Sequence, residues 1–131
     1  MTTRRTFADF LVDMRGAAAK AQAFVSGLNY EAFAADEKTA FAVVRALEIL
    51  GGAAKRIPQE IRDQNPEVPW RSMTGIRDKL IHDYTSANLE IVWKTVMEDL
   101  PGLVPQIERI IQAVSEQESA EQNAPPDSGG V

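Results

Sequence analysis

The spacing of the hydrophobic residues is the feature that most constrains how this chain can fold. They recur every three or four positions along most of the sequence, which is the pattern of amphipathic helices. Strand signals are weak, because the β-branched residues are scattered and no hairpin dipeptide separates alternating runs. The sequence therefore predicts an all-α fold, an antiparallel bundle of four to five helices. The predicted helices span residues 5–26, 36–57, 69–83, 88–99 and 103–117, with a turn at 28–36 and Asp36 as an N-cap.

Glycine and proline mark special points of these helices. Gly51 and Gly52 interrupt a run of good helix formers, where each glycine costs about 1 kcal/mol relative to alanine. We attribute this pair to the close approach of a neighbouring helix. Pro101 and Gly102 predict a kink or a tight junction before the last helix.

The length of 131 residues fits one domain, and 44% hydrophobic residues are enough for a core. We assign residues 1–117 to a helical domain and residues 118–131 to a disordered acidic tail rich in Pro and Gly. The chain has no Cys and one His, which excludes a disulfide, a thiol nucleophile and a multi-His metal site within one chain. We expect neither a metal nor another cofactor.

The formal net charge of −5 argues at first against nucleic acid as a partner. However, residues 116–131 hold four acidic residues and no basic one, which leaves 15 acidic against 14 basic residues in the rest of the chain. The body is therefore nearly neutral and can still bind nucleic acid locally. No apolar run follows Arg4 and Arg5, and none reaches the roughly 20 residues of a membrane helix. We expect a cytoplasmic protein that does not bind membranes.

The predicted helix 69–83 carries an arginine where a core residue is expected. Its apolar stripe contains the residues Trp70, Met73, Ile76, Leu80, Ile81 and Tyr84, and Arg77 falls inside this stripe. An unpaired guanidinium in a core is strongly unfavourable. Either Arg77 pairs with an acidic residue, or the stripe faces a subunit interface with a polar cleft.

The one histidine, His82, lies near the end of the same helix. It follows Arg77 by five residues, which is about 140° around an ideal helix, so one straight helix does not aim both side chains at one point. Asp78 precedes His82 by four residues and can hydrogen-bond the imidazole and fix its tautomer. The alternative is a half-exposed histidine with no function.

The sequence from Arg77 to Tyr84, RDKLIHDY, resembles the R-x4-H-x-Y signature of the HepT family, minimal toxins of the HEPN superfamily. The similarity extends over roughly residues 8–112, through the segments DFLVDM, EAFAADEKT, RALEILGGAAKRIP, NPEVPWRSMTGIRDKLIHDY and LEIVWKTVMEDLPGL. Two positions depart from the family pattern. Gly52 replaces a residue that is commonly acidic, and Asp78 one that is commonly Asn.

The resemblance implies a metal-independent endoribonuclease that serves as the toxin of a type VII toxin–antitoxin pair. Such cleavage has the 2′-OH attack the adjacent phosphate, and it needs a base, an acid and positive charge on the phosphorane. His82 suits either proton transfer near neutral pH, and Arg77 suits the phosphate oxygens. Because one His cannot easily fill both proton roles, a two-fold homodimer with both pairs in one cleft is expected.

By the same resemblance, Tyr84 is the residue that the cognate antitoxin, a minimal nucleotidyltransferase called MntA, modifies with AMP. Added phosphate and adenosine beside Arg77 would repel and exclude RNA. The alternative for Tyr84 is a core or interface tyrosine. The alternative for the whole chain is a non-catalytic HEPN-like binding partner of a minimal nucleotidyltransferase.

Other residues allow both a binding role and an ordinary one. Trp70 and Trp93 can stack RNA bases, or they can be core residues at helical spacing. Several exposed cations can follow an RNA backbone, or they can simply be solvated helix faces. These cations are Arg4, Arg5, Arg15, Lys20, Lys55, Arg56, Arg71 and Lys79.

Overall fold

The computed structural model describes residues 6–82 and 88–123, and for residues 81, 82, 88, 122 and 123 it describes the backbone alone. The described residues form seven α-helices and one π-helical segment, with no strand, which confirms the all-α prediction. These elements are α1 (Phe7–Val25), α2 (Tyr30–Ala35), α3 (Glu37–Ala54), α4 (Gln59–Gln64), α5 (Trp70–His82), α6 (Asn88–Lys94), η1 (Thr95–Asp99) and α7 (Leu100–Asn123).

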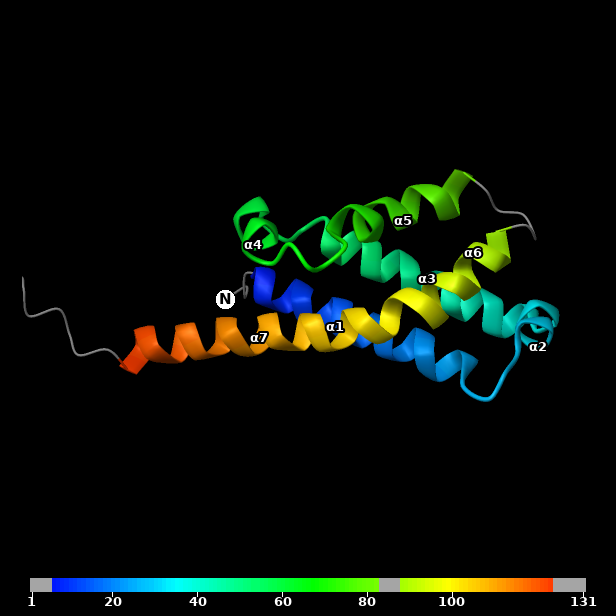
Figure 1. The fold of residues 1–131 in the computed structure, drawn as a ribbon, viewed down its shortest axis with the longest axis horizontal. Helices are drawn as coiled ribbons and strands as arrows, with labels where there is room; N and C mark the ends of the chain where they lie inside the picture. The colour runs from blue at the N-terminus through cyan, green and yellow to red at the C-terminus, as the bar shows by residue number, and fades with distance from the viewer. Residues whose placement is uncertain (1–5, 83–87, 124–131) are drawn as a thin grey trace, which may run out of the picture.

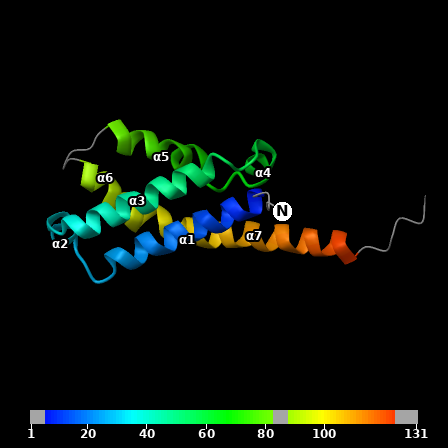
Figure 2. The ribbon, with the colours of Figure 1, turned by 180° about the vertical axis from the view of Figure 1, so that it is seen from behind.

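The long helices form an antiparallel bundle (Figures 1 and 2). Helix α1 packs against α3 on one side and α7 on the other, and α5 packs against α3. The segments α6, η1 and α7 follow one another as a single helical arm, whose far end projects beyond the other helices. No described helix has both the length and the apolarity needed to cross a membrane.

The core is built from the inner faces of these helices, and its largest fully buried side chains come from nearly every element. They are Phe33, Leu11, Met14, Leu47, Leu50, Ile57, Met73, Leu100, Leu103, Ile107, Val43 and Val92. The hydrophobic spacing places Phe41 and Ile49 on the apolar side of the predicted helix 36–57, but in the structure they are 50% and 41% exposed. Helix α3 carries more hydrophobic side chains than its packing against α1 and α5 buries.

Helix α3 begins as the sequence predicts. The Asp36 carboxylate accepts hydrogen bonds from the Thr39 N–H at 3.1 Å and the Thr39 hydroxyl at 2.7 Å. These bonds, the hydroxyl first, lower the pKa of Asp36 because they favour its charged form. The preceding turn is more ordered than predicted, because Asn29 caps the short helix α2 by accepting from the Ala32 N–H at 2.8 Å.

The predicted junction at Pro101 is a widened turn rather than a break. Pro101 has no N–H to donate, and its ring conflicts with the carbonyl four residues earlier in an α-helix. The chain instead forms the π-helical segment η1, in which the Leu100 N–H donates to the Thr95 carbonyl. The arm then continues to Asn123, so residues 118–123 of the predicted tail are helical. Residues 124–131 lie outside the described part.

Candidate active site around Arg77 on helix α5

The crossing of α3 and α5 fixes the position of the candidate site. A Cβ atom added at Gly51 would lie 2.8 Å from Ile76 Cγ2 and 3.1 Å from the Met73 carbonyl oxygen. Gly51 is buried, so only the absence of a side chain lets α5 approach this closely. This confirms the prediction of close helix approach for Gly51.

The neighbouring Gly52 has a different surrounding. A Cβ atom added there would lie 3.9 Å from Arg77 Nη1, an ordinary contact distance. The Arg77 guanidinium therefore lies over the α3 position where the resemblance leads us to expect an acidic residue. In this chain no carboxylate is present at that position to neutralise it.

Arg77 lies at the edge of the buried stripe of α5, not inside it. Met73, Ile76 and Leu80 are buried, whereas Arg77 is exposed. Within the described part of the chain, no hydrogen bond or ion pair engages its guanidinium. The expected pairing of Arg77 with an acidic residue is therefore not seen in the described part of the chain. Its charge is open to a ligand.

Asp78, the predicted support of His82, instead approaches the cation of Lys55, the residue that follows α3. Its Oδ1 lies 3.8 Å from Lys55 Nζ, and the two side chains are 67% and 45% exposed. Such an exposed pair contributes little to stability. The hydrogen bond expected from the His82 imidazole to the Asp78 carboxylate stays a prediction, because the His82 side chain lies outside the described atoms.

Helix α5 continues through His82, so the angle expected between Arg77 and His82 around the helix axis applies to the structure as well. About 140° of rotation around the helix axis then separates the two side-chain directions within one chain. Tyr84 lies outside the described residues. Of the four predicted site residues, the structure thus places the side chains of Arg77 and Asp78 alone.

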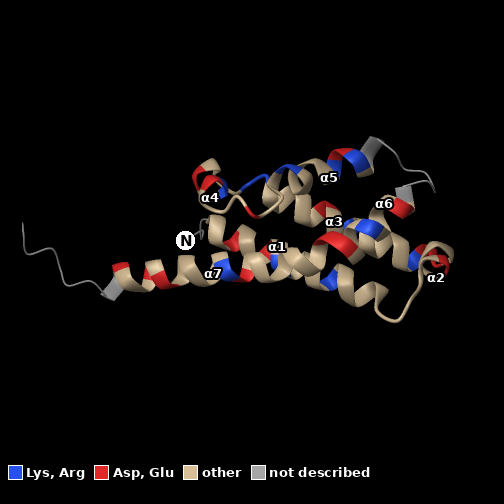
Figure 3. Ribbon diagram, in the orientation of Figure 1, with Lys and Arg blue, Asp and Glu red and all other residues tan. Residues whose placement is uncertain are grey.

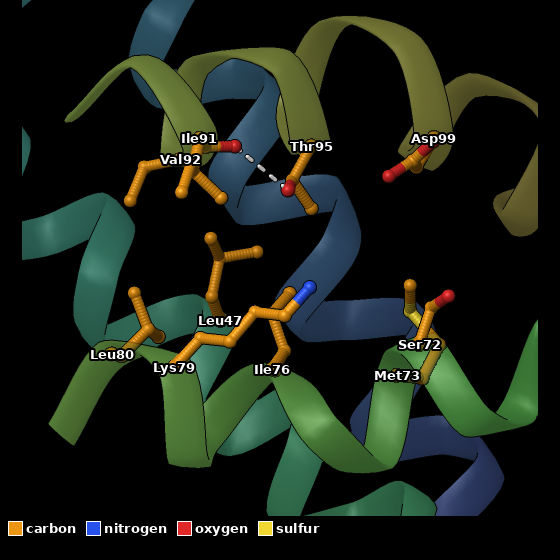
Figure 4. A pocket seen from close by; sticks show the side chains of 10 residues that line it. All are labelled: Leu47, Ser72, Met73, Ile76, Lys79, Leu80, Ile91, Val92, Thr95 and Asp99. Atoms are coloured by element: carbon orange, nitrogen blue, oxygen red, sulfur yellow. Dashed lines mark hydrogen bonds between the residues drawn. The ribbon is translucent and has the colours of Figure 1, made fainter. Parts of the chain in front are cut away.

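A small cavity lies on the other flank of α5, between this helix and the segments α6 and η1 (Figure 4). Its volume is about 90 Å³. Leu47, Ile76 and Val92 contribute apolar walls, and Lys79 and Asp99 lie at a more polar rim. The Thr95 hydroxyl donates to the Ile91 carbonyl at 2.8 Å, so that rim hydroxyl is already engaged within its own helix.

A larger groove of about 470 Å³ lies between α4 and the first turns of α5. Arg62 forms a fixed wall, because its guanidinium donates to the carbonyls of Ile57 at 3.0 Å, Ala54 at 3.1 Å and Lys55 at 3.3 Å. Reasoning from the sequence missed this groove. The only signals were Arg71, among the cations that can follow an RNA backbone, and Trp70, among the residues that can stack bases.

The two tryptophans are structural. Trp70 is 8% exposed, and its indole N–H donates to the Asn65 carbonyl at 2.9 Å. Trp93 packs against Phe33 and Tyr30, with ring centroids 5.3 Å and 6.1 Å apart. Both therefore occupy the packing role that the sequence left open.

Charge is distributed unevenly over the molecule (Figure 3). Helix α5 carries Arg71, Arg77 and Lys79 against the single acidic residue Asp78. The projecting end of α7 carries Glu116, Glu118 and Glu121 with no cation. Among the described residues, no three His, Asp or Glu side chains lie close enough together to hold a metal ion.

Comparison with known proteins connects this arrangement to a family. The family model described as "Ribonuclease HepT-like" matches residues 14–110, which include Arg77 and His82. A "Probable ribonuclease HepT" from Thermococcus cleftensis is 43% identical over 107 residues, covering 82% of this chain and 97% of that protein. No solved structure matches the chain.

Two further relatives carry names that assign them provisionally as RNases. One, from Caldanaerobacter subterraneus subsp. tengcongensis, is 42% identical over 67% of this chain and 79% of its own length. The other, from Methanocaldococcus jannaschii, is 40% identical over 70% of this chain and 75% of its own length. With most of its length matched by one family model and by these relatives, the chain belongs to the HepT-like ribonuclease family of the HEPN superfamily.

Proposed function

We propose that this chain is a metal-independent endoribonuclease and the toxin of a type VII toxin–antitoxin pair. The observation that carries the proposal is Arg77, whose guanidinium lies exposed over Gly52 without a hydrogen bond or ion pair in the described part of the chain. It stands in the region matched by the ribonuclease family model. A cation on a helix that is fixed by a tight crossing, and that no acidic side chain neutralises in the described part of the chain, is suited to bind a phosphate.

The proposed reaction is transfer of the RNA phosphate to the neighbouring 2′-OH. His82 accepts the 2′-OH proton or donates a proton to the leaving 5′ oxygen, and Arg77 stabilises the charge that develops on the phosphorane oxygens. The products are a 2′,3′-cyclic phosphate and a free 5′-OH. The step needs no metal, since side chains accept the proton of the 2′-OH, donate a proton to the leaving 5′ oxygen and supply the positive charge.

A homodimer supplies the second proton-transfer group. Because α5 is helical through His82, Arg77 and His82 of one chain point about 140° apart, and two chains around one cleft remove this difficulty. Helix α3 exposes the hydrophobic residues Phe41 and Ile49, which favours a protein interface on this helix. In the dimer, each Arg77 and His82 pair contributes to the shared cleft.

Regulation is proposed to act on Tyr84. A cognate MntA nucleotidyltransferase attaches AMP to its hydroxyl, seven residues after Arg77 in sequence. The added phosphate competes with RNA for Arg77, and the adenosine fills space in the cleft.

Cleavage of RNA by the purified protein in the presence of EDTA tests the catalytic part. His82→Ala and Arg77→Ala should each lower the rate by about 10²–10³-fold, the scale for losing one group that stabilises the transition state. Lys79→Ala is the matched control, because it removes an exposed cation from the same helix and should leave the rate nearly unchanged. Equal rates for wild type and His82→Ala would refute the assignment.

The alternative function, a non-catalytic partner of a nucleotidyltransferase, makes the opposite expectation. Expression of this chain alone would then leave growth unaffected. Growth arrest that requires both Arg77 and His82 excludes it.

AMP transfer is tested by intact mass after co-expression with the cognate nucleotidyltransferase. A mass increase by whole AMP units that disappears in Tyr84→Phe supports the modification. An unchanged mass together with suppressed toxicity means that the antitoxin works by another route.

A further inference from the structure

The groove between α4 and α5 has the size and lining of a ligand site. Its volume of about 470 Å³ lies within the range of typical small-molecule pockets. Arg62, Asp63, Trp70, Arg71 and Thr74 contribute to its lining. Its walls therefore combine two cations, one carboxylate, one hydroxyl and the edge of an indole.

The groove lies on the same side of α5 as Arg77. Trp70 and Thr74, which line the groove, precede Arg77 by seven and three residues and so lie on its side of the helix. Arg71 lies further around, about 120° from Arg77 about the helix axis. The rise from Arg71 to Arg77 along the helix axis is about 9 Å, so an RNA strand that turns around the helix as it advances can contact both side chains. A strand bound at Arg77 can therefore continue into the groove.

We propose that this groove binds the RNA nucleotide that flanks the cleavage site, with Arg71 as its phosphate-binding residue. The inference rests on the proposed ribonuclease function and adds a substrate contact outside the cleavage site. Arg71 is exposed, and in the described part of the chain its guanidinium makes no hydrogen bond or ion pair. It can thus form a charged, bidentate contact with a phosphate.

The opposite wall gives the bound nucleotide an orientation. Asp63 is held in place, because its Oδ1 accepts a hydrogen bond from Gln59 Nε2 at 2.8 Å. Its carboxylate repels a phosphate, but it can accept a hydrogen bond from the amino group of a base. The phosphate is therefore directed to Arg71 and the base edge to Asp63. Trp70 forms part of the wall and is too buried to stack on the base.

Binding and cleavage can be measured separately. The probe is a short fluorescent oligoribonucleotide with 2′-O-methyl groups, which cannot be cleaved through its 2′ oxygens, and the readout is fluorescence anisotropy with the full chain. Arg71→Ala should weaken binding about tenfold, the effect of losing one charged hydrogen-bonded contact. It should also reduce the slope of log K against log salt concentration by about one, because one fewer counterion is released.

The matched control is Lys79→Ala, which removes an exposed cation of α5 that lines the cavity beside α6 and η1 and not the groove. It should change the dissociation constant less than about twofold, because nonspecific attraction is weak for a nearly neutral body. Arg71→Lys should recover part of the lost affinity. Asp63→Asn should weaken binding of strands rich in cytosine or adenine more than that of strands rich in uracil.

With cleavable RNA, Arg71→Ala should raise KM and leave kcat within about twofold, because a binding contact outside the reacting atoms is lost. Equal weakening by Arg71→Ala and Lys79→Ala, or no binding of the probe by wild type, overturns the groove proposal. If RNA is cleaved but Arg71→Ala changes neither binding nor KM, the groove proposal fails and the ribonuclease assignment stands. If binding of the probe depends on Arg71 but no RNA is cleaved, the groove proposal stands and the ribonuclease assignment fails.

Discussion

The two flanks of helix α5 differ in how tightly they are packed. On the α3 side, Gly51 lets the backbones approach so closely that even one added methyl group would collide with Ile76 and Met73. On the side of α6 and η1, a cavity of about 90 Å³ separates the elements. The same helix is thus fixed on one side and loosely covered on the other.

This difference matters because Arg77 belongs to the tight flank. Its guanidinium lies over α3 one residue beyond the closest point of the crossing. Positioning of a charged group within a few tenths of an ångström is what catalysis by electrostatic stabilisation requires. We infer that the packing of Gly51 positions Arg77, whereas the cavity side contributes less to the geometry of the site.

The substitution Gly51→Ala tests the tight flank and should have the largest effect on stability. The new Cβ would meet a stiff β-branched methyl group and a backbone carbonyl, so α5 itself must shift. Overpacking of this kind costs about 1–3 kcal/mol, offset by about 1 kcal/mol from the better helix propensity of alanine. We expect a net loss of about 1–2 kcal/mol in urea unfolding, together with lower ribonuclease activity at temperatures where the variant is folded.

An unchanged stability for Gly51→Ala would mean that α5 moves into the neighbouring cavity without penalty. The tight flank would then not be rigid. If stability fell but the activity of the folded variant stayed at the wild-type level, the crossing would support the fold without positioning Arg77.

The sequence predicted those features of the fold that depend on local pattern. Hydrophobic spacing located the long helices, Asp36 was identified as an N-cap, and Gly51 was attributed to a close helix approach. Each of these depends on residues near one another in sequence or on one strong steric requirement. Such features can be recognised before any tertiary contact is known.

Features that depend on tertiary packing could not be predicted in this way. Periodicity assigns Phe41 and Ile49 to an apolar face, but only the positions of α1 and α5 decide which side chains they cover. For the same reason Arg77 was placed within the apolar stripe and lies at its edge. The groove beside Arg71 arises from the packing of α4 on α5, which no spacing within either segment indicates.

The substitution Gly52→Ala is the matched partner of the first prediction and should have the opposite sign. Its Cβ would lie 3.9 Å from Arg77 Nη1 and requires no shift of α5. The gain in helix propensity should stabilise the protein by about 0.5–1 kcal/mol. The measurement is the same urea unfolding experiment. Destabilisation as large as that of Gly51→Ala would show that the two neighbouring positions are equally crowded.

The substitution Val92→Ile tests the loose flank and should have the smallest effect. Val92 is buried and lines the cavity, so an additional methylene can enter empty space without displacing a neighbour. Burying one methylene contributes at most about 0.8 kcal/mol, and we expect about half of this value because the side chain loses some rotamer freedom. Urea unfolding should show a small gain in stability, and ribonuclease activity should stay unchanged because Arg77 lies on the other flank.

A loss of stability in Val92→Ile would mean that this flank is as closely packed as the α3 side. A loss of activity at unchanged stability would mean that the cavity side also determines where Arg77 lies.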